Sequence, residues 1–433
     1  MLDWVWSFSA RPRTADELTA QRVAKLERMR ALLAGLGQPQ QSFPSVLVAG
    51  TKGKGSTVAM ISACLSAAGL RTGRYTSPHL VNWRERACVD AQPISVDAVL
   101  NLAEPIRRAV DRIPRQLGAP TTFEVGTAFA LAYFAQQRAD VAVLEVGTGG
   151  RFDATNVVDP LAAAITPISY DHTATLGESL SEIAWHKAGI MRAGRPAVAG
   201  PQPEEARLVL EREADLVGAH LEEVGRDWRW SSSRDAIRVE SSQPGFQALT
   251  TGVALLGDHQ RDNATTAVAT LHALQPHFAV PSPAIQRGLT TVDWPGRLQV
   301  LSERPLLVVD GAHNAASADA LRKAIRHEFR FDRLILVLGL SEGKDARGVI
   351  GALVPEADVV CLTRSRHERA APPSDLEPLV RSAAPGATLG SYDDVPTALG
   401  AATAAARAGD LVLVTGSLFL VGEALVWWRH SSR

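Results

Sequence analysis

The segment V-A-G-T-K-G-K-G-S-T at residues 48–57 combines the residue types that bind phosphate groups. Glycines allow the backbone to approach a phosphate closely and to take up positive φ angles, and Lys54 supplies positive charge. An ordinary phosphate-binding loop carries Ser or Thr directly after Gly-Lys, whereas Gly55 occupies that position in this chain. We therefore predict a nucleotide site of a variant kind, formed by Gly50, Thr51, Lys52, Gly53, Lys54, Gly55, Ser56 and Thr57.

Two lysines of this loop compete for contact with the terminal phosphates. Lys54 stands beside the expected helix start, where backbone N–H groups and the helix dipole favour an anion. We therefore expect Lys54 to neutralise the β- and γ-phosphate oxygens, and the role of Lys52 stays open. The alternative for the whole loop is a glycine turn that only starts a helix.

Polar residues follow three further apolar runs, at the points where strands are expected to end. Ser77 lies in T-S-P-H-L, Glu145 ends the run V-L-E, and Asp171 and His172 come soon after the apolar stretch 162–167. Ligands of open α/β sheets bind beyond the carboxyl ends of the strands, and magnesium prefers oxygen ligands. Glu145 is thus a candidate magnesium ligand, with a satisfied buried carboxylate as the alternative. For His172 the alternative is a surface histidine.

The elements that would position these residues alternate between strand and helix, which predicts a parallel sheet covered on both faces. Hydrophobic spacing and glycine or proline punctuation predict helices at 15–36, 58–68, 124–135, 180–188, 203–217 and 263–274, and strands at 45–49, 141–146, 162–167 and 197–199. Residues 226–254 change character and predict a short antiparallel excursion.

Prolines 276, 281 and 283 and the segment W-P-G-R at 294–297 break this pattern and indicate a boundary near Pro295. A second series follows, with strands at 306–310, 333–338, 359–362 and 411–415 and helices at 315–328, 349–353, 376–383 and 395–408. We therefore predict two domains, 1–295 and 296–433.

Composition limits the functional class. The chain has 433 residues, of which 46% are hydrophobic, and a formal net charge of −1, so no overall basic field favours nucleic acid or an anionic membrane. The three cysteines have no metal-binding spacing, and no apolar run reaches the length of a membrane span. The N-terminus has no signal-peptide pattern. We expect a soluble cytoplasmic protein without nucleic-acid or membrane partners.

A series of motifs in order along the chain resembles one known family. The motifs are G-T-K-G-K-G-S-T, T-S-P-H-L, L-E-V-G-T-G-G-R-F-D-A-T-N, D-H-T, H-K-A-G-I, G-D-H-Q-R-D-N, W-P-G-R, D-G-A-H-N and T-G-S-L-F-L-V-G. Together, from about Leu26 to Glu423, they resemble the folylpolyglutamate synthase/dihydrofolate synthase family of the Mur ligase superfamily, whose loop carries G-K-G-S. The resemblance implies an α/β fold with an N-terminal P-loop-type ATPase domain, built on a mainly parallel sheet, and a smaller C-terminal Rossmann-like domain.

The resemblance also implies an activity, in which ATP phosphorylates a folate or pteroate carboxylate and L-glutamate attacks the acyl phosphate to form an amide. It implies a monomer and assigns roles to residues of this chain. Lys54, Lys187 and His172 match catalytic residues. Ser77, Glu145, His172 and a carbamylated Lys187 match magnesium ligands. ATP contacts match Asn263, Arg297, Asp310 and His313, and contacts to the pterin substrate match Thr122, Phe123 and Asp153.

The sequence departs from the family pattern at a few positions, with lysine at 52 where asparagine is frequent and His186 where an acid is common before Lys187. The segment before Leu26 does not match well. Two other functions are left as alternatives: a cell-wall Mur-type ligase acting on a UDP-sugar peptide, and an ATP-dependent switch without ligase activity. Whether the chain would make dihydrofolate, extend polyglutamate tails or do both stays open.

Overall fold

The computed structural model describes residues 15–233 and 236–431. The chain divides into two compact units. Among the described residues, the larger unit consists of 15–79, 84–233, 236–254 and 259–293, and the smaller one of Leu80–Trp83, Leu255–Asp258 and 294–431.

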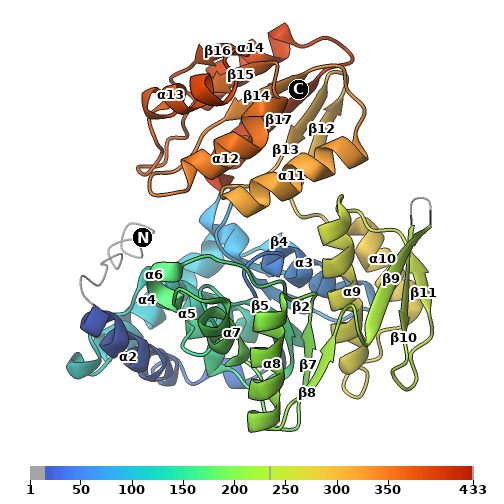
Figure 1. Ribbon diagram of the computed structural model, residues 1–433. Helices are drawn as coiled ribbons and strands as arrows, with labels where there is room; N and C mark the ends of the chain where they lie inside the picture. The colour runs from blue at the N-terminus through green and yellow to red at the C-terminus, as the bar shows by residue number, and fades with distance from the viewer. Residues whose placement is uncertain (1–14, 234–235, 432–433) are drawn as a thin grey trace. The chain divides into compact units, whose positions relative to one another are not determined.

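The larger unit is built around an eight-stranded sheet with the order β4-β3-β2-β5-β1-β6-β7-β8 (Figure 1). Its strands are β1 Ser45–Ala49, β2 Thr72–Tyr75, β3 Ala87–Val89, β4 Gln92–Pro93, β5 Val141–Glu145, β6 Pro160–Ile165, β7 Pro196–Ala199 and β8 His220–Glu223. All neighbours from β2 to β8 pair in parallel, and β3 and β4 add an antiparallel edge. The central strands β1 and β5 are buried along their whole length, as is usual for parallel strands covered on both faces.

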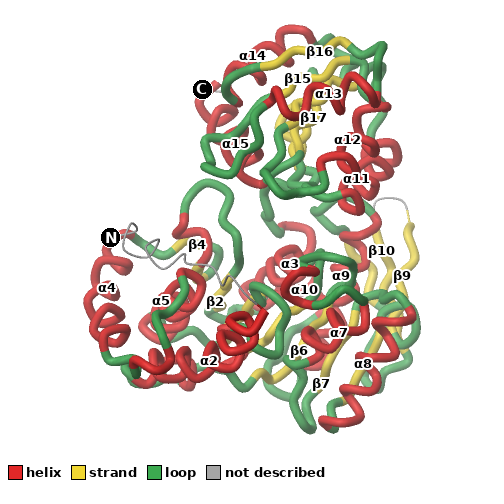
Figure 2. Tube along the Cα trace, turned by 60° about the vertical axis from the view of Figure 1, so that its left-hand side comes forward, coloured by secondary structure: helices red, strands yellow, loops and turns green. Residues whose placement is uncertain are grey.

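Helices surround this sheet (Figure 2). They are α2 Ala15–Ala34, α3 Lys54–Ala67, α4 Val96–Asp111, α5 Thr122–Gln136, α6 Thr173–Leu176, α7 Leu180–Ala188, α8 Glu204–Val217, α9 Asp258–Ala273 and α10 Ser282–Thr291. Short 3₁₀ turns occur at Pro39–Gln41, Trp83–Arg86, Arg115–Leu117 and Ala154–Val157. Helix α3 packs against β1, β2 and β5, and α10 packs along α3.

A separate three-stranded antiparallel sheet, β11-β10-β9, belongs to the larger unit. Its strands are β9 Trp228–Ser233, β10 Ala236–Ser241 and β11 Leu249–Thr251, which confirms the antiparallel excursion predicted for 226–254. The buried ring of Trp228 packs edge-on against Phe246, with ring centroids 4.6 Å apart.

The smaller unit has a six-stranded sheet with the order β12-β13-β17-β14-β15-β16. Its strands are β12 Gln299–Glu303, β13 Leu306–Val309, β14 Leu334–Leu338, β15 Val359–Leu362, β16 Thr388–Ser391 and β17 Leu411–Thr415. The helices are α11 Ala315–Glu328, α12 Ala346–Leu353, α13 Pro373–Ala383, α14 Val395–Ala405 and α15 Leu418–Ser431, with a 3₁₀ turn at Val354–Glu356.

Alternate residues of β14 enter two different hydrophobic cores in the smaller unit. Leu334, Leu336 and Leu338 pack with residues of α11, α12 and α13, whereas Ile335 and Val337 pack with residues of α14 and α15. Successive side chains of a strand point to opposite faces, so helices cover both faces of this sheet (Figure 2). The predicted α/β fold class with two sheets is confirmed.

Several element boundaries differ from the predicted ones. Helix α3 begins at Lys54 instead of residue 58, and α9 begins at Asp258 instead of residue 263. The prolines at 281 and 283 do not end the pattern but open helix α10, with Pro281 as its N-cap residue. Proline is favoured in the first helical turn because its missing N–H has no intrahelical partner there.

Candidate functional site

Four neighbouring strands of the larger unit bring the predicted site segments to one edge of the sheet. The strands β2, β5, β1 and β6 lie side by side and run parallel, so their carboxyl ends share one edge (Figure 1). Residues 76–77, Glu145, residues 50–53 and residues 166–172 stand at or directly after these ends. We predicted from the sequence that these segments lie together at the carboxyl ends of strands. The parallel order of β2, β5, β1 and β6 brings them to one edge.

Two positions of the glycine loop, Gly50 and Gly53, require glycine because their φ angles are positive and because other atoms lie where a Cβ atom would stand. Gly53, the N-cap residue of α3, has φ of 83°, and a Cβ atom there would lie 2.3 Å from Asn263 Oδ1. Gly50 has φ of 139°, and a Cβ atom there would lie 1.9 Å from Thr166 Oγ1. The first intrahelical bond runs from the Thr57 N–H to the Gly53 carbonyl at 2.9 Å. The amides before it belong to the helix start, where backbone donors lack intrahelical partners and attract anions.

The loop is also fastened to the segment that follows β6. The N–H groups of Thr51 and Lys52 donate to the Pro167 carbonyl at 3.1 and 3.3 Å. The Thr51 hydroxyl donates to the Ser169 carbonyl at 3.0 Å and accepts from the Ser169 N–H at 3.1 Å. The loop conformation is therefore set by bonds to a neighbouring strand end and not by the loop alone.

Two lysines belong to the loop, and a third reaches it from helix α7. The Lys54 ammonium donates to the Thr51 carbonyl at 3.2 Å, and Lys187 of α7, which is only 3% exposed, donates to the Gly50 carbonyl at 2.7 Å. Burial, followed by the positive charge of Lys54, lowers the pKa of Lys187 to about 7. Burial also lowers the pKa of Lys52 to about 8, against the opposing effect of Asp171. The lysine side chains gathered at this loop suit a phosphate chain.

Glu145 and Ser77 are in direct contact across neighbouring strands. The Ser77 N–H donates to Glu145 Oε2 at 3.0 Å, and Glu145 is 6% exposed. Arg86 is close enough that the Glu145 and Tyr75 charges raise its pKa, although burial, the larger effect, lowers it. Arg86 Nε also donates to His79 Nδ1 at 3.0 Å. The sequence did not indicate a role for Arg86, because the charged segment around it is typical of an exposed surface.

His172 lies in the segment that follows β6. It is the N-cap residue of the short helix α6 and has a left-handed backbone with φ of 52°. Its N–H donates to Asp171 Oδ1 at 2.9 Å, and its side chain is exposed. A left-handed conformation is uncommon for residues other than glycine, so His172 occupies an unusual backbone turn at the start of α6.

The residues present fit a nucleotide with a divalent cation. The hydroxyls of Thr57 and Ser169, at the edge that carries the loop, are buried without a hydrogen-bond partner in the described parts of the chain. Buried polar groups normally have partners, so these atoms mark a place where a polar ligand would be accommodated. The described residues contain no group of three or more His, Cys, Asp or Glu side chains arranged so that they could hold a metal ion by themselves. Magnesium is commonly held by one or two carboxylates together with substrate phosphates and water, which suits Glu145 and Ser77.

The residues predicted to contact the pterin substrate lie close together. Phe123 packs against Tyr75 with ring centroids 5.9 Å apart, and a Cβ atom at Gly147 would come within 2.5 Å of the Phe123 ring. Thr122 is the first residue of α5, one residue before Phe123. Asp153 is buried and accepts from the Thr148 N–H at 3.1 Å.

Lys25 of α2 belongs to this group, although sequence reasoning missed it. Its ammonium is 3.5 Å from Asp153 Oδ2 and 5.6 Å from the Phe123 ring centroid. Lys25 stands just before the part of the chain that resembles the family, so the motifs could not point to it. The sequence does indicate that Lys25 lies on the predicted helix 15–36, three residues before a second cation, Arg28, and therefore on the same helix face.

The other predicted ATP contacts fall into one group in each unit. In the larger unit, Asn263 of α9 borders the glycine loop at Gly53 and donates to Gln260 Oε1 at 3.0 Å. In the smaller unit, a Cβ atom at Gly311 would lie 2.6 Å from the Arg297 guanidinium.

Asp310 and His313 stand after β13 of the smaller unit and are held by backbone groups. Asp310 accepts from the N–H groups of Leu298 and Ala312, each at 2.8 Å. Nδ1 of His313 is 2.8 Å from the Gly311 carbonyl. Because a carbonyl oxygen can only accept, Nδ1 of His313 carries the proton of this bond.

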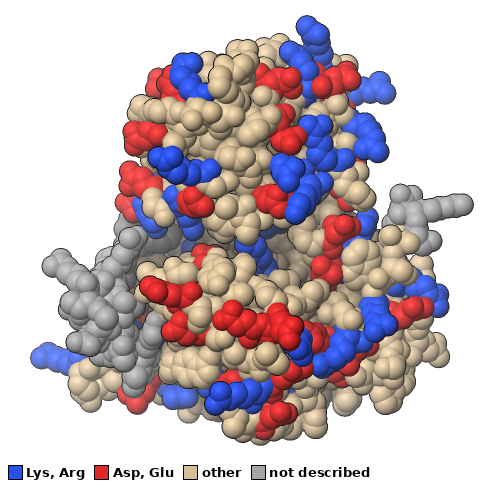
Figure 3. Space-filling view, in the orientation of Figure 1, with Lys and Arg blue, Asp and Glu red and all other residues tan. Residues whose placement is uncertain are grey.

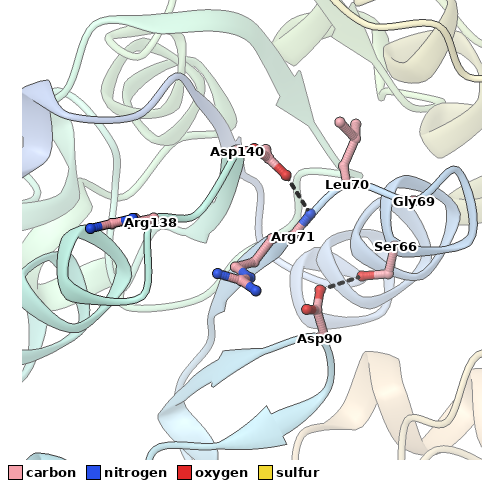
Figure 4. A pocket seen from close by; sticks show the side chains of 7 residues that line it. All are labelled: Ser66, Gly69, Leu70, Arg71, Asp90, Arg138 and Asp140. Carbon is pink, nitrogen blue, oxygen red and sulfur yellow. Dashed lines mark hydrogen bonds between the residues drawn. The ribbon is translucent and has the colours of Figure 1, made fainter.

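A pocket of about 380 Å³ lies at the opposite edge of the larger unit's sheet (Figure 4). It is lined by residues that precede β2 and β5, including Arg71 and Asp140. The Arg71 N–H donates to Asp140 Oδ2 at 2.7 Å, and the Ser66 hydroxyl donates to Asp90 Oδ1 at 3.3 Å. These two bonds join lining residues to one another, and the pocket is separate from the candidate site.

Charges of both signs are interspersed over the face shown in Figure 3. On α11, Arg322 and Lys323 both pair with Asp319. Within residues 15–233 and 236–431, every helix is too short or too polar to traverse a bilayer. All three cysteines are buried and free.

Comparison with known proteins places these features in a family. Residues 48–271 match the family model of the Mur ligase middle domain, and residues 296–418 match that of the Mur ligase, glutamate ligase domain. A probable bifunctional folylpolyglutamate synthase/dihydropteroate synthase of Halobacterium salinarum is 39% identical over 407 residues, covering 92% of this chain and 49% of the relative. The chain therefore spans about half the length of that relative. The dihydrofolate synthase/folylpolyglutamate synthase of Mycobacterium tuberculosis is 38% identical, covering 92% of this chain and 89% of the relative.

Solved structures are similar along almost the whole chain. E. coli FolC in complex with DHPP and ADP has a TM-score of 0.88 and 32% identity, covering 100% of this chain and 97% of that one. A bifunctional folylpolyglutamate synthase/dihydrofolate synthase with Mn, AMPPNP and L-glutamate bound has a TM-score of 0.83 and 32% identity, covering 98% and 96%.

Proposed function

Because the chain belongs to the folylpolyglutamate synthase/dihydrofolate synthase family of the Mur ligases, we propose that it adds L-glutamate to a folate or pteroate carboxylate with ATP as the energy source. One observation of this chain carries the proposal. The glycine loop, the buried Lys187 and the Ser77–Glu145 pair come together at one sheet edge, and the Phe123–Asp153 group belongs to the same unit. A phosphate site and an acceptor site are the two parts that a ligase of this kind requires.

The reaction proposed has two steps. A carboxylate oxygen of the acceptor attacks the γ-phosphorus of ATP, and ADP leaves. The amine of L-glutamate then attacks the carbonyl carbon of the acyl phosphate, and phosphate and a proton leave as the amide forms. Phosphoryl transfer is accelerated mainly by positioning and by positive charge around the transferred group.

We assign the roles of the phosphate side as follows. Lys54 and the amides at the start of α3 would bind the phosphate chain, and Asn263, Arg297, Asp310 and His313 would bind the rest of ATP. Ser77, Glu145 and His172 would hold magnesium, which when bound helps to neutralise the phosphate oxygens. The bonds from Thr51 and Lys52 to the Pro167 carbonyl would keep the loop in shape before ATP arrives.

Carbamylation of Lys187 is a further part of the proposal. An amine must be neutral to attack carbon dioxide, and the carbamate that forms, after losing a proton, carries a carboxylate that could hold a second magnesium ion. Burial lowers the pKa of Lys187 to about 7, so a large share of this amine is neutral near pH 7. A carbonyl signal on Lys187 in protein supplied with ¹³C-bicarbonate would support carbamylation, and an unlabelled amine in active protein would rule it out.

The decisive experiment is a steady-state assay of phosphate release with ATP and L-glutamate, comparing dihydropteroate with tetrahydrofolate. We expect release that requires glutamate and one of the pterin substrates together, with a glutamylated product found by mass spectrometry. ATP hydrolysis that neither substrate changes would favour the switch. Turnover with a UDP-sugar peptide alone would favour a cell-wall ligase.

The remaining features of the proposal concern the whole protein. We propose a cytoplasmic monomer in which residues 1–295 bind ATP and residues 296–433 form the glutamate ligase domain. The free, buried cysteines are compatible with a reducing compartment. Light scattering of the purified chain would test the monomer, and expression of 296–433 alone would test the domain division.

A further inference from the structure

The N-terminal helix α2 contributes two cations to the acceptor side of the larger unit. Lys25 and Arg28 are three residues apart and therefore lie on the same face of the helix. We propose that Lys25 recognises the heteroaromatic ring of the pterin substrate, and that the Arg28–Glu124 ion pair positions Lys25. This inference rests on the function proposed above and adds a specificity-determining residue to it.

The ion pair between Arg28 and Glu124 is buried and well formed. Arg28 Nε donates to Glu124 Oε1 at 2.8 Å, and Nη2 donates to Oε2 at 3.0 Å. Arg28 Nη1 donates to the Leu117 carbonyl at 2.8 Å. Arg28 is 5% exposed and Glu124 is fully buried. A two-bonded guanidinium–carboxylate pair of this type fixes orientation as well as distance, so it holds α2 against the start of α5.

The same carboxylate also organises the start of α5. Glu124 Oε2 accepts from the Thr121 N–H at 2.8 Å and from the Thr121 hydroxyl at 2.6 Å, while the Thr121 hydroxyl oxygen accepts from the Glu124 N–H at 3.2 Å. This reciprocal arrangement is a capping box. Phe123 stands between Thr121 and Glu124 in this first turn. The ion pair therefore positions both the helix that carries Lys25 and the turn that carries Phe123.

Lys25 is placed to act on a ligand, unlike Arg28. Its side chain is 22% exposed, and its ammonium is 5.6 Å from the Phe123 ring centroid. The 3.5 Å distance to Asp153 Oδ2 is longer than the usual charge-assisted hydrogen bond of about 2.7–2.9 Å. Asp153 already accepts from Thr155 and Thr148 at 2.8–3.1 Å. The ammonium can therefore turn towards a substrate without leaving Asp153 unsatisfied.

The arrangement suits one class of ligand. Once the Lys25 ammonium turns away from its position over the Phe123 ring, that ring offers a stacking surface for a flat heterocycle. The ammonium then offers donors to acceptor atoms on the edge of that heterocycle. A pterin has a carbonyl oxygen and ring nitrogens of this kind. The alternative is that the Lys25–Asp153 contact is a partly exposed ion pair, which contributes little by itself.

The test is the kinetics of Lys25→Met, which keeps the length of the side chain and removes its charge. We expect the KM for the pterin substrate to rise about tenfold, as for the loss of one hydrogen bond from a charged donor, with little change in the KM for ATP or glutamate. Lys25→Arg should restore most of the affinity. The matched control is Lys323→Met on α11 of the smaller unit, whose side chain is 69% exposed and which should change none of the three constants.

A second variant tests the positioning element. Arg28→Lys keeps a positive charge but loses the two-bonded geometry, so it should raise the KM for the pterin substrate and leave that for ATP near the wild-type value. Far-ultraviolet circular dichroism checks that both variants fold. If Arg28→Lys changes all three constants alike, or if Lys25→Met leaves the pterin KM unchanged, the inference is wrong.

Failure of the inference can be told apart from failure of the proposed function. Wild-type protein without pterin-dependent phosphate release would overturn the function. The inference would still be judged by titrating wild-type and Lys25→Met protein with dihydropteroate and following binding by calorimetry. Equal affinities, or no binding to wild-type protein, would overturn it, and a loss of affinity of about tenfold in the variant would support it.

Discussion

Replacement of Lys187 by methionine should make the metal-free protein more stable while removing ligase activity. Lys187 is 3% exposed, and its pKa is lowered from 10.5 to about 7, chiefly by burial and then by the charge of Lys54. A lysine with a lowered pKa in the folded state binds a proton more weakly when folded than when unfolded. Protonation therefore favours unfolding at every pH below the unfolded pKa.

The size of the effect follows from the two pKa values. Each unit of difference corresponds to about 1.4 kcal/mol, so at pH 7 the buried lysine destabilises the metal-free fold by on the order of 4 kcal/mol. This cost is greatest below pH 7 and declines to nothing as the pH rises from about 7 to about 10.5. Methionine removes the cost but also loses the bond to the Gly50 carbonyl, which offsets about 1–3 kcal/mol. A net gain of roughly 2 kcal/mol near neutral pH remains.

Urea unfolding at pH 6, 7 and 9 measures this gain. The protein is treated with EDTA, freed of nucleotide and kept in bicarbonate-free buffer, so that neither metal nor a carbamate changes the charge of Lys187. The quantity compared is the shift in transition midpoint between Lys187→Met and wild type, since a protein of two units need not unfold in one step. Lys323→Met, at an exposed site, serves as the control. A midpoint shift that is the same at all three pH values, or a variant less stable than wild type at pH 6, would refute the reasoning.

Three further predictions concern the phosphate site. Lys54→Ala should abolish ligation and leave the circular dichroism spectrum unchanged; loss of helical signal would make the lysine structural. Gly53→Ala should cost about 1–2 kcal/mol of stability from left-handed strain. Its Cβ would also meet Asn263, so ATP binding measured by calorimetry should weaken as well. Gly37→Ala, with positive φ but open space around it, should show the strain alone. Glu145→Gln should shift the magnesium titration of activity to higher concentration, and an unchanged titration would contradict its role as a ligand.

The buried parallel strands and several helices were predictable from the sequence. The bounds of β1, β15, β17, α7 and α11 match the predicted ranges at both ends. Each of these elements is either a continuous apolar run, as expected for a strand buried on both faces, or a helix opened by a capping side chain. Ser179 caps α7 and Asn314 caps α11. In such segments the local signal and the tertiary environment agree.

Helix α10 was not predictable, because its signals were ambiguous without the tertiary structure. The sequence S-P-A-I-Q-R-G-L-T-T contains a proline and a glycine, which usually interrupt helices. In the structure the proline stands in the first turn, where it is favoured. Gly288 allows close approach to α3, since a Cβ atom there would lie 2.5 Å from the Cys64 backbone. Both residues fit the helix for reasons that only its neighbour supplies.

The candidate site was predictable as far as the strand order allowed. Residues at the carboxyl ends of parallel strands must share an edge, and the contact between Ser77 and Glu145 follows from β2 and β5 being neighbours. Lys25 was not predictable in this way. It meets Asp153 across 128 residues of sequence, and no motif links a helix at the start of the chain to a turn after β5.

The glycine at position 55 has a physical consequence that links the loop to its neighbours. In an ordinary phosphate-binding loop the hydroxyl after Gly-Lys holds the metal, but Gly55 has no side chain to do so. The next two residues along the chain, Ser56 and Thr57, carry hydroxyls, but both side chains are buried in the first turns of α3. Ser77 stands instead at the end of β2, and its amide holds Glu145 at 3.0 Å. We therefore expect the cation to be held from the β2 and β5 side of the loop, which explains why the loop can carry glycine where other nucleotide-binding loops need serine or threonine.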